Sequence, residues 1–235
     1  MRSLQCGLVF LFSLVVLSHW AYGQSNRSND LLSIYDSILG ISNLGLVNGV
    51  AHTRAFISRK THPYYNSNAW EEGQVELVTG IFPNVRLKYD TFQEVLVLGI
   101  TRVDGRLHAI QLQPHDVLGF SLGTAEFCRL KGQRIGNGFF QVLYPGDQIK
   151  FLSRRRKKDE IPTGSPTVEY VADHEYYFYR EDQLYSFKNK SSLFELIPER
   201  RDDIKAFIKN QKLKIKAQER YISDVQQLIA FMDEL

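Results

Sequence analysis

The stretch VELVTGIFPNVRLKYDTFQEVLVLGI, residues 75–100, decides the fold class of this chain. It is rich in β-branched and aromatic residues, and turn-forming residues at Gly80, Pro83–Asn84 and Asp90–Glu94 divide it into short runs. Within those runs the apolar residues that alternate with polar ones are Val75, Leu77, Val85, Leu87 and Tyr89. Alternation with a period of two is typical of strands that bury one face, so the stretch predicts an antiparallel sheet.

The same pattern continues to about residue 188, with turn signals between the runs. VDGR (103–106) holds an Asp-Gly hairpin signal, PGD (145–147) a turn, and EDQ (181–183) a tight turn without the glycine that favours a primed type. The further candidate strands are DVLGFSL, AEFCRL, GFFQVLY, DQIKFLS, TVEYVA, EYYFYR and QLYSF. About ten short, evenly spaced strands predict an antiparallel barrel or sandwich.

Helical periodicity appears at both ends of the β region. Apolar residues from Leu31 to Leu39 recur at spacings of three and four, which predicts a short N-terminal helix. SSLFEL holds a capping box of Ser192 with Glu195, Pro198 can open a second helix, and a third begins near Ala217. The chain is therefore expected to be α+β, with an N-terminal stub and helix (24–43), an antiparallel β domain (44–188) and a helical segment packed on it (189–235).

The first 23 residues have the organisation of a signal peptide. Arg2 gives a positive start, Leu8–Leu17 an apolar core, and Ala21–Gly23 the small residues of a cleavage site before Gln24. The alternative is a membrane anchor, but the apolar run is short against the ~20 residues that a spanning helix needs. The expectation is an exported protein of the periplasm, the outer-membrane surface or the exterior, with no transmembrane span after cleavage.

Cleavage would leave 212 residues, enough for one sizeable domain, with 28 Lys and Arg against 26 Asp and Glu. This near-neutral balance argues against nucleic acid as a partner. Cys128 would be the only cysteine, which excludes an internal disulfide and a cysteine-based metal site. The five remaining histidines lack metal-ligand spacing, so neither a metal nor another cofactor is expected.

Four motifs resemble a family of uncharacterised exported proteins that is widespread in Bacteroidota. They are GLVNG (45–49), VRLKYD (85–90), GFFQVLY (138–144) and YYFYREDQLYSFKNKSSLFEL (176–196). The resemblance covers nearly all of the chain after the signal peptide and keeps the order of the motifs. It implies a β-rich fold and a location in a Gram-negative envelope, and it implies no enzymatic activity.

GFSLG (119–123) matches the Gly-x-Ser-x-Gly pattern that places a nucleophilic serine in α/β-hydrolases. Ser121 would then sit on a turn between a strand and a helix, with an acid and a histidine later in the chain. The following TAEFCRL favours a strand, and no alternation of strands and helices builds a parallel sheet. A serine hydrolase using Ser121 is therefore the least favoured hypothesis, and the protein is not expected to be an enzyme.

The tyrosine-rich segment around residues 176–179 is a candidate binding surface. Alternation puts Tyr176 and Phe178 on one face of a strand and Tyr177 and Tyr179 on the other. One face must be core, and the other offers aromatic platforms for a sugar ring or a protein partner. The alternative is cross-strand packing under the C-terminal helices.

Five consecutive cations, Arg154, Arg155, Arg156, Lys157 and Lys158, follow the apolar run IKFLS. Asp159, Glu160 and the loop-like PTGSP come next, so the run is expected to be a solvated loop that leaves a strand. A narrower hypothesis is contact with anionic lipid headgroups or surface polysaccharide, at about 1 kcal/mol per cation at best.

These expectations combine into two hypotheses for an exported protein of the cell envelope. The first is a non-enzymatic β-rich binding or assembly module, whose ligand is a lipid or glycan. The alternative is a structural component that interacts with another envelope protein through edge strands or tyrosines.

Overall fold

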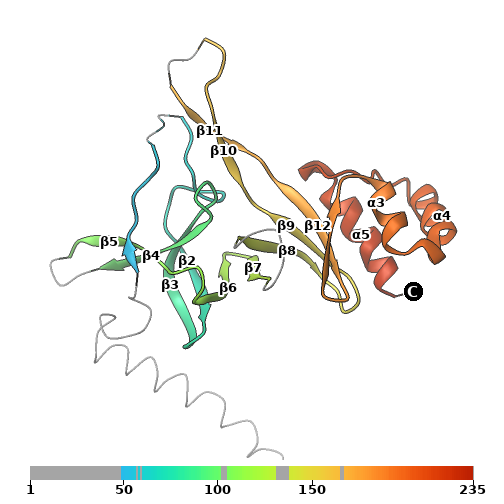
Figure 1. Cartoon of the computed structure of the whole chain (residues 1–235), viewed down its shortest axis with the longest axis horizontal. Coiled ribbons are helices and arrows are strands. Elements are labelled where there is room, and N and C mark those ends of the chain that lie inside the picture. The colour runs from blue at the N-terminus through green and yellow to red at the C-terminus, as the bar shows by residue number, and fades with distance from the viewer. Residues whose placement is uncertain are drawn as a thin grey trace, which may run out of the picture. The chain divides into compact units, whose positions relative to one another are not determined.

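The computed structural model describes residues 49–56, 58, 60–101, 105–130, 138–164 and 167–234, drawn in colour in Figure 1. The signal peptide expected at 1–23 and the helix expected at 31–39 lie outside the described residues. Residues from Asn48 onward form one compact unit by their contacts, and the account below concerns that unit.

The fold class is α+β, mainly antiparallel β, as the sequence predicts. The strands are β1 (Val50–Ala51), β2 (Glu71–Leu77), β3 (Gly80–Asp90), β4 (Val95–Thr101), β5 (Leu107–Gln111), β6 (Val117–Leu122), β7 (Ala125–Arg129), β8 (Phe139–Pro145), β9 (Lys150–Arg154), β10 (Lys157–Glu160), β11 (Glu169–Ala172), β12 (Glu175–Arg180) and β13 (Gln183–Phe187). Eleven form one sheet in the order β1-β5-β4-β3-β2-β6-β7-β8-β9-β12-β13, and β10 pairs with β11. The unit is sandwich-like, the second of the two alternatives that the sequence leaves open.

The opening stretch forms the end of β2, all of β3 and most of β4, and its alternation determines which side chains are buried. Leu87 and Tyr89 on β3 are buried, with the polar Arg86 exposed between Leu87 and Val85. Pro83–Asn84 does not end a strand as expected. Instead the β2–β3 register shifts between Gly73 and Val75, and Asn84 opposite this irregularity has φ +56°. The turn residues are absorbed as a bulge within a longer strand.

Aromatic side chains from four strands fill the β part of the core. The Tyr89 ring centroid lies 5.3 Å from those of Phe120 and Phe127, which stack on each other at 4.5 Å. Phe139 packs edge-on against Phe120 at 5.1 Å. Burial raises the pKa of the Tyr89 hydroxyl, so this group stays neutral in the core.

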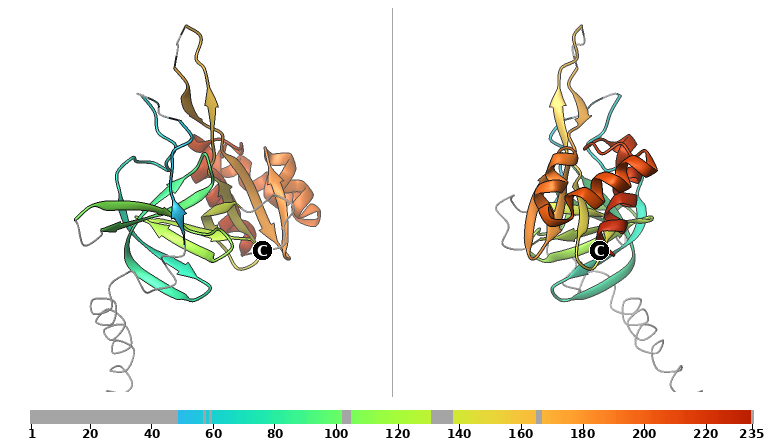
Figure 2. Two further views of the ribbon diagram at one scale, coloured as in Figure 1. Left: turned by 60° about the vertical axis from the view of Figure 1, so that its left-hand side comes forward. Right: turned by 90° about the vertical axis from the view of Figure 1, so that its right-hand side faces the viewer.

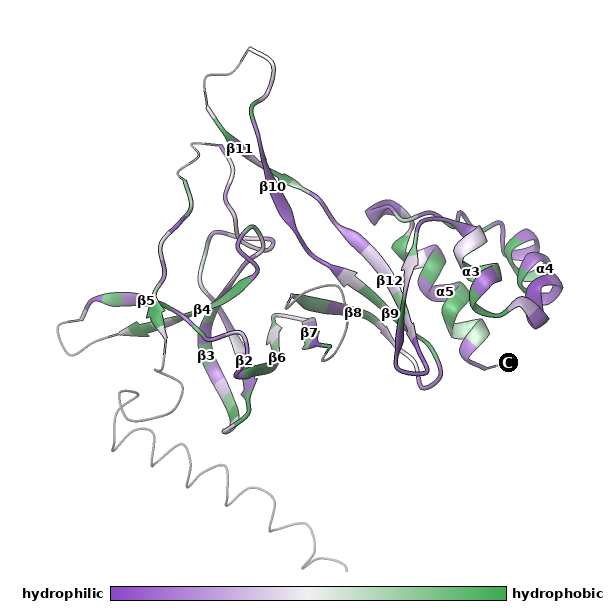
Figure 3. Cartoon of the chain, viewed as in Figure 1, coloured by the Kyte–Doolittle hydropathy of each residue, from purple (hydrophilic) through white to green (hydrophobic). Residues whose placement is uncertain are grey.

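Helices cover one face of the sheet at its C-terminal end, where Figure 2 shows them against β8, β9, β12 and β13. They are α3 (Lys190–Leu196), the short 3₁₀ turn η3 (Pro198–Arg200), α4 (Arg201–Gln211), the 3₁₀ turn η4 (Glu219–Tyr221) and α5 (Ile222–Asp233). Helix α5 buries Val225, Leu228, Ile229 and Met232, whereas α4 buries only Ile204. Figure 3 accordingly shows α5 largely apolar and α4 largely polar. The three helices that the sequence predicts after residue 188 are confirmed.

The end of α5 is fixed to the β8–β9 turn by one carboxylate. Asp233 Oδ1 accepts hydrogen bonds from the backbone N–H groups of Gln148 (2.8 Å) and Ile149 (2.9 Å). Its Oδ2 accepts from the N–H of Asp147 at 3.0 Å. Each of these three N–H groups therefore has an acceptor, and Asp233 holds the C-terminal end of α5 against the β8–β9 turn.

The prediction that a solvated loop begins after residue 153 is wrong. Arg154 ends β9, and residues 157–160 form β10, which pairs with β11 from Lys157↔Ala172 to Glu160↔Glu169. Because β9 also pairs with β12, these four strands form one long hairpin that is interrupted at residues 155–156 and 173–174. Figure 1 shows its outer half, β10–β11, extending beyond the large sheet. The charged run is ordered because both of its ends are paired with neighbouring strands, Arg154 in β9 and Lys157–Lys158 in β10.

The predictions for the start of α3 and for the type of the EDQ turn are also wrong. The N-cap of α3 is Asn189, whose side chain accepts from the Ser191 N–H at 2.8 Å, and Ser192 of the expected capping box lies inside the helix. The EDQ turn is a primed two-residue turn after all, since Glu181 (φ +50°) and Asp182 (φ +59°) both have left-handed backbones. Asp182 Oδ1 accepts from the Tyr179 hydroxyl at 2.8 Å, which helps to hold the turn without glycine.

This turn provides a test of local strain. Glu181→Asn should stabilise the protein by about 0.5–1 kcal/mol, because Asn tolerates the left-handed conformation better than Glu. The lost ion pair with Arg180 is exposed on the Glu181 side (72 %) and contributes little. Urea unfolding measures the change. Glu126→Asn, at an exposed strand position without positive φ, is the control and should not stabilise; equal effects would contradict the strain at Glu181.

Candidate functional site

The interruption of the long hairpin is the centre of the candidate site. In β9, Phe151 and Ser153 face the helices, and Leu152 lies on the opposite face with Tyr177 and Phe140. Continued alternation sends Arg154 to the face of Leu152 and Arg155 to the face of Phe151. The two neighbouring cations therefore reach opposite sides of the sheet.

Arg154 forms a two-point ion pair with Glu94, from the turn between β3 and β4. Its Nε donates to Oε1 at 2.6 Å and its Nη2 to Oε2 at 2.8 Å, with both side chains largely buried. Gly138 packs directly on this pair, since a Cβ there would lie 2.7 Å from Glu94 Oε1 and 2.8 Å from Arg154 Nε. The pair joins β9 to a turn 60 residues earlier in the chain.

Arg155 is 4 % exposed and pairs with Glu219, the first residue of η4. Its two terminal nitrogens donate to the two Glu219 oxygens, the longer bond being 3.1 Å, and its Nε donates to Gln141 Oε1. The Tyr176 hydroxyl donates to Glu219 Oε2 at 2.8 Å. Burial disfavours the charged carboxylate, but the bonds from Arg155 and Tyr176 outweigh it and hold the pKa of Glu219 below its ordinary range.

A cavity of about 280 Å³ lies at this interruption, and we call it the junction pocket. It is lined by Tyr65, Asn66, Thr91, Arg155, Lys157, His174 and Glu219. Lys157 Nζ donates to the carbonyl oxygens of His62 (2.8 Å) and Tyr64 (2.6 Å), and burial lowers its pKa. Burial and the nearby Arg155 charge also lower the pKa of His174, whose Nδ1 is buried and has no hydrogen-bond partner in the described residues.

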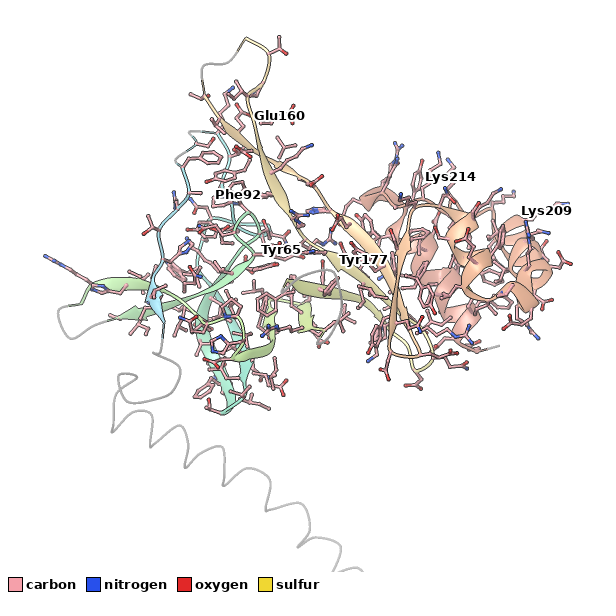
Figure 4. All side chains as sticks on the ribbon, viewed as in Figure 1. Tyr65, Phe92, Glu160, Tyr177, Lys209 and Lys214 are labelled. Atoms are coloured by element: carbon pink, nitrogen blue, oxygen red, sulfur yellow. The ribbon has the colours of Figure 1, made fainter. Side chains whose placement is uncertain are left out.

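A second, larger depression of about 620 Å³ lies within the helical part, and we call it the lysine groove. It is lined by Asn189, Lys190, Ser191, Ile208, Leu213, Lys214, Ile215, Lys216 and Tyr221. Two segments distant in sequence meet here, through the bridge Asn189↔Lys216 and the bond from the Ala217 N–H to the Lys188 carbonyl (3.0 Å). Figure 4 shows Lys214 extending outward from this part of the molecule.

The groove is basic because its lysines lack acidic partners. In KLKIK (212–216) the apolar Leu213 and Ile215 turn inward, and the alternating lysines are exposed. With Lys188 and Lys190 they make five exposed lysines, none of which forms an ion pair with any described residue. Asp224 contacts this segment through its backbone, since its Oδ2 accepts from the Lys214 N–H at 2.8 Å.

The cationic run of the sequence is not the solvated cluster that we expected. Arg155 is buried, Arg154 is paired with Glu94, and Lys157 is held by two carbonyls. The Arg156 side chain is 38 % exposed, with long contacts to Glu94 (3.8 Å) and Glu175 (3.9 Å), and Lys158 is exposed. Contact of the run with an anionic surface stays a prediction, but two of its five cations are already committed to internal ion pairs.

The tyrosines alternate as predicted. The C-terminal helices pack on the face that carries Tyr176 and Phe178, and Tyr177 and Tyr179 lie on the opposite face. Tyr177 is 7 % exposed, its ring centroid lies 5.7 Å from that of Phe140, and Figure 4 places it within the sheet. Burial and the neighbouring Glu175 raise the pKa of Tyr177 to about 12, so its hydroxyl stays a donor to that carboxylate (3.1 Å). Ligand binding by this face stays a prediction that now depends on the half-buried Tyr179.

Ser121 lies within β6, which turns directly into β7, so the strand-to-helix elbow of a hydrolase is missing around it. Its hydroxyl oxygen accepts from the Gln74 N–H at 3.2 Å. Among the described residues no group of three His, Cys, Asp or Glu side chains is placed to hold a metal ion. His52 instead lies beside the buried Asp90, with Nε2 3.4 Å from Oδ2.

Comparison with known proteins adds no relative. The chain matches no protein-family model, no curated protein and no solved structure. The resemblance to exported proteins of Bacteroidota therefore stays a prediction. In the part of the chain that the structure describes, no helix is both long and apolar enough to cross a bilayer.

Sequence reasoning missed both depressions. The partners of Arg154 and Arg155 lie 60 and 64 residues away, and no local pattern marks them. One side of the lysine groove could have been predicted from the sequence, because KLKIK (212–216) alternates like an amphipathic strand. Its other half, Lys188 and Lys190, joins only through the tertiary fold.

The buried ion pair can be tested by removing one partner. Arg155→Met should destabilise the fold by about 2–3 kcal/mol, below the 3–5 kcal/mol typical of fully buried pairs because Glu219 is 62 % exposed. Arg156→Met should cost about 0.5 kcal/mol or less. Urea unfolding with unchanged slope measures both, and similar losses for the two variants would contradict the distinct role of Arg155.

Glu219 makes the stability depend on acidity. Its pKa is lowered on folding, so its contribution is fully present above the ordinary glutamate pKa of ~4.3 and is lost as the pH falls through the folded-state value. The stability difference between wild type and Glu219→Gln should therefore be largest at neutral pH and shrink in acid. In an Arg155→Met background the same substitution should give a much smaller pH dependence; an unchanged one would contradict the assignment.

Proposed function

We propose that this chain is an exported, non-enzymatic binding module of the cell envelope whose ligand is an anionic lipid held in the lysine groove. The observation that carries the proposal is the set of exposed lysines on the two segments that meet at a largely apolar depression. Lys190, Lys214 and Lys216 line it, and Lys188 and Lys212 lie two residues away from them along the chain. Export rests on the signal-peptide pattern of residues 1–23.

The lysines favour an anion because their positive charges repel one another and no acidic side chain among the described residues pairs with them. Each exposed ammonium near an anionic lipid surface contributes about 1 kcal/mol, and the contributions of neighbouring lysines accumulate. Lysine is a flexible point charge, which suits a phosphate group that the protein does not need to orient. The groove thus matches the charge of a phospholipid headgroup.

The floor of the groove favours an amphiphile over a purely polar anion. Ile208, Leu213, Ile215 and Tyr221 line it beneath the lysines. Apolar surface gains about 25 cal/mol for each Å² removed from water, so an acyl chain on this floor adds to the attraction at the rim. A nucleic acid or an acidic glycan would use the rim and leave the apolar floor uncovered.

One observation favours the alternative, a component that binds another envelope protein. Strand β13 (Gln183–Phe187) is an edge of the described sheet, and its sequence QLYSF has no charge and no proline to discourage pairing. An extended segment of a partner could add to this edge. The lysine groove, about 620 Å³ in volume, is the stronger feature and supports the lipid.

Vesicle co-sedimentation of the protein without residues 1–23 tests the proposal. Binding to phosphatidylcholine vesicles that contain phosphatidylglycerol should exceed binding to phosphatidylcholine alone. Lys214→Gln/Lys216→Gln should weaken it about 30-fold, the equivalent of roughly 1 kcal/mol for each lysine.

Lys150→Gln/Lys158→Gln removes the same charge from exposed positions outside the helical part, where neither lysine forms an ion pair with a described residue, and is the matched control. It should leave most of the binding intact. Equal losses in the two double variants, equal binding to neutral vesicles, or binding to acidic polysaccharide in preference to vesicles would each overturn the lipid assignment.

A further inference from the structure

The junction pocket is a second candidate binding site, separate from the lysine groove and lined by different residues. Its wall includes Arg155, which is 4 % exposed, together with Lys157 and His174. Among the described residues of the lining, Glu219 is the only carboxylate. It is already engaged by two nitrogens of Arg155 and by the Tyr176 hydroxyl.

Several hydrogen-bonding groups of the lining remain unused. An ammonium has three N–H donors, and carbonyl oxygens engage two of those of Lys157. The buried Nδ1 of His174 has no hydrogen-bond partner among the described residues, and Asn66 is an exposed lining residue whose amide can add a contact. Buried polar groups are normally satisfied, so the unpaired nitrogen of His174 beside a cavity points to a ligand.

The charges around Lys157 are consistent with an anion. No carboxylate lies within ion-pair distance of its ammonium among the described residues. The buried Asp90 acts on Lys157 only at longer range. Its Oδ1 accepts from the backbone N–H groups of Phe92 and Gln93, and its Oδ2 accepts from Gln93 Nε2. A cation that is partly removed from water gains most from a new negative partner.

We propose that the junction pocket binds a phosphate group, either as free phosphate or as a small phosphate ester. The guanidinium fork of Arg155, which would suit a planar carboxylate, is already used by Glu219. Lys157, Asn66 and His174 offer single contacts from three separate segments, which suits a compact tetrahedral anion. The volume of about 280 Å³ admits a small ligand and no polymer.

The experiment is a titration of the protein without residues 1–23, followed by two-dimensional NMR of its backbone amides at constant ionic strength kept with chloride. Inorganic phosphate should give saturable shifts at residues 65–66, 91, 155–157 and 174. A parallel titration with glycerol 3-phosphate distinguishes the sources: tighter binding than phosphate assigns an ester, and weaker binding assigns the free ion.

Two variants test the site. Asn66→Gly removes the amide and keeps the left-handed backbone (φ +38°), and it should weaken phosphate binding about tenfold. Lys157→Met should abolish saturation; if it fails to fold, the Asn66 variant decides alone. Lys150→Met, at an exposed position of β9, is the control and should bind like wild type.

Phosphate shifts that are unchanged in the Asn66 and Lys157 variants, or that spread over exposed lysines, would mean an adventitious ion only and overturn the proposal. The Lys214→Gln/Lys216→Gln protein must keep the shifts at the junction pocket. Their loss in that variant would place the phosphate in the lysine groove instead. The lipid proposal and the phosphate proposal can therefore fail separately.

Discussion

Two adjacent arginines, at the end of β9 and directly after it, connect the parts of this fold. Because a strand points successive side chains to opposite faces, Arg154 and Arg155 reach opposite sides of the sheet from neighbouring positions. Arg154 holds Glu94 of the β3–β4 turn, and Arg155 holds Glu219 at the start of η4. One step along the backbone thus links the first half of the sheet with the helical layer.

The alternation of apolar side chains specifies the register of the long hairpin. A slip of one residue would exchange the faces of Phe151 and Leu152, whereas arginines flank Arg155 on both sides, so that an arginine would still reach Glu219. Buried ion pairs contribute little net stability compared with apolar packing, but a broken pair leaves an unpaired buried charge and is strongly disfavoured. The two ion pairs therefore connect distant parts of the chain and are costly to break, whereas the apolar side chains set the register.

The sequence predicted what depends on neighbours along the chain and missed what depends on distant ones. Alternation identified the strands and the faces of Tyr176 to Tyr179, and period-3.6 stripes identified the C-terminal helices. The charged run was assigned to a solvated loop because blocks of charge usually are solvated, and nothing local reveals Glu94 or Glu219. The junction pocket could not be predicted for the same reason, since its seven lining residues come from five separate stretches of chain.

The segment 214–221 explains how the two candidate sites come to be ordered together. Its lysines line the groove, and Glu219 in the same segment closes the junction pocket. Its regular structure is limited to η4. Its contacts with the rest of the fold include Asp224 on the Lys214 N–H, the bridge to Asn189, the Ala217 N–H on the Lys188 carbonyl, and the bonds of Glu219 to Arg155 and Tyr176. Fixing a segment before a ligand arrives removes an entropic cost from binding. The arginine that pairs with Glu219 therefore also helps to preorganise the lysines at the surface.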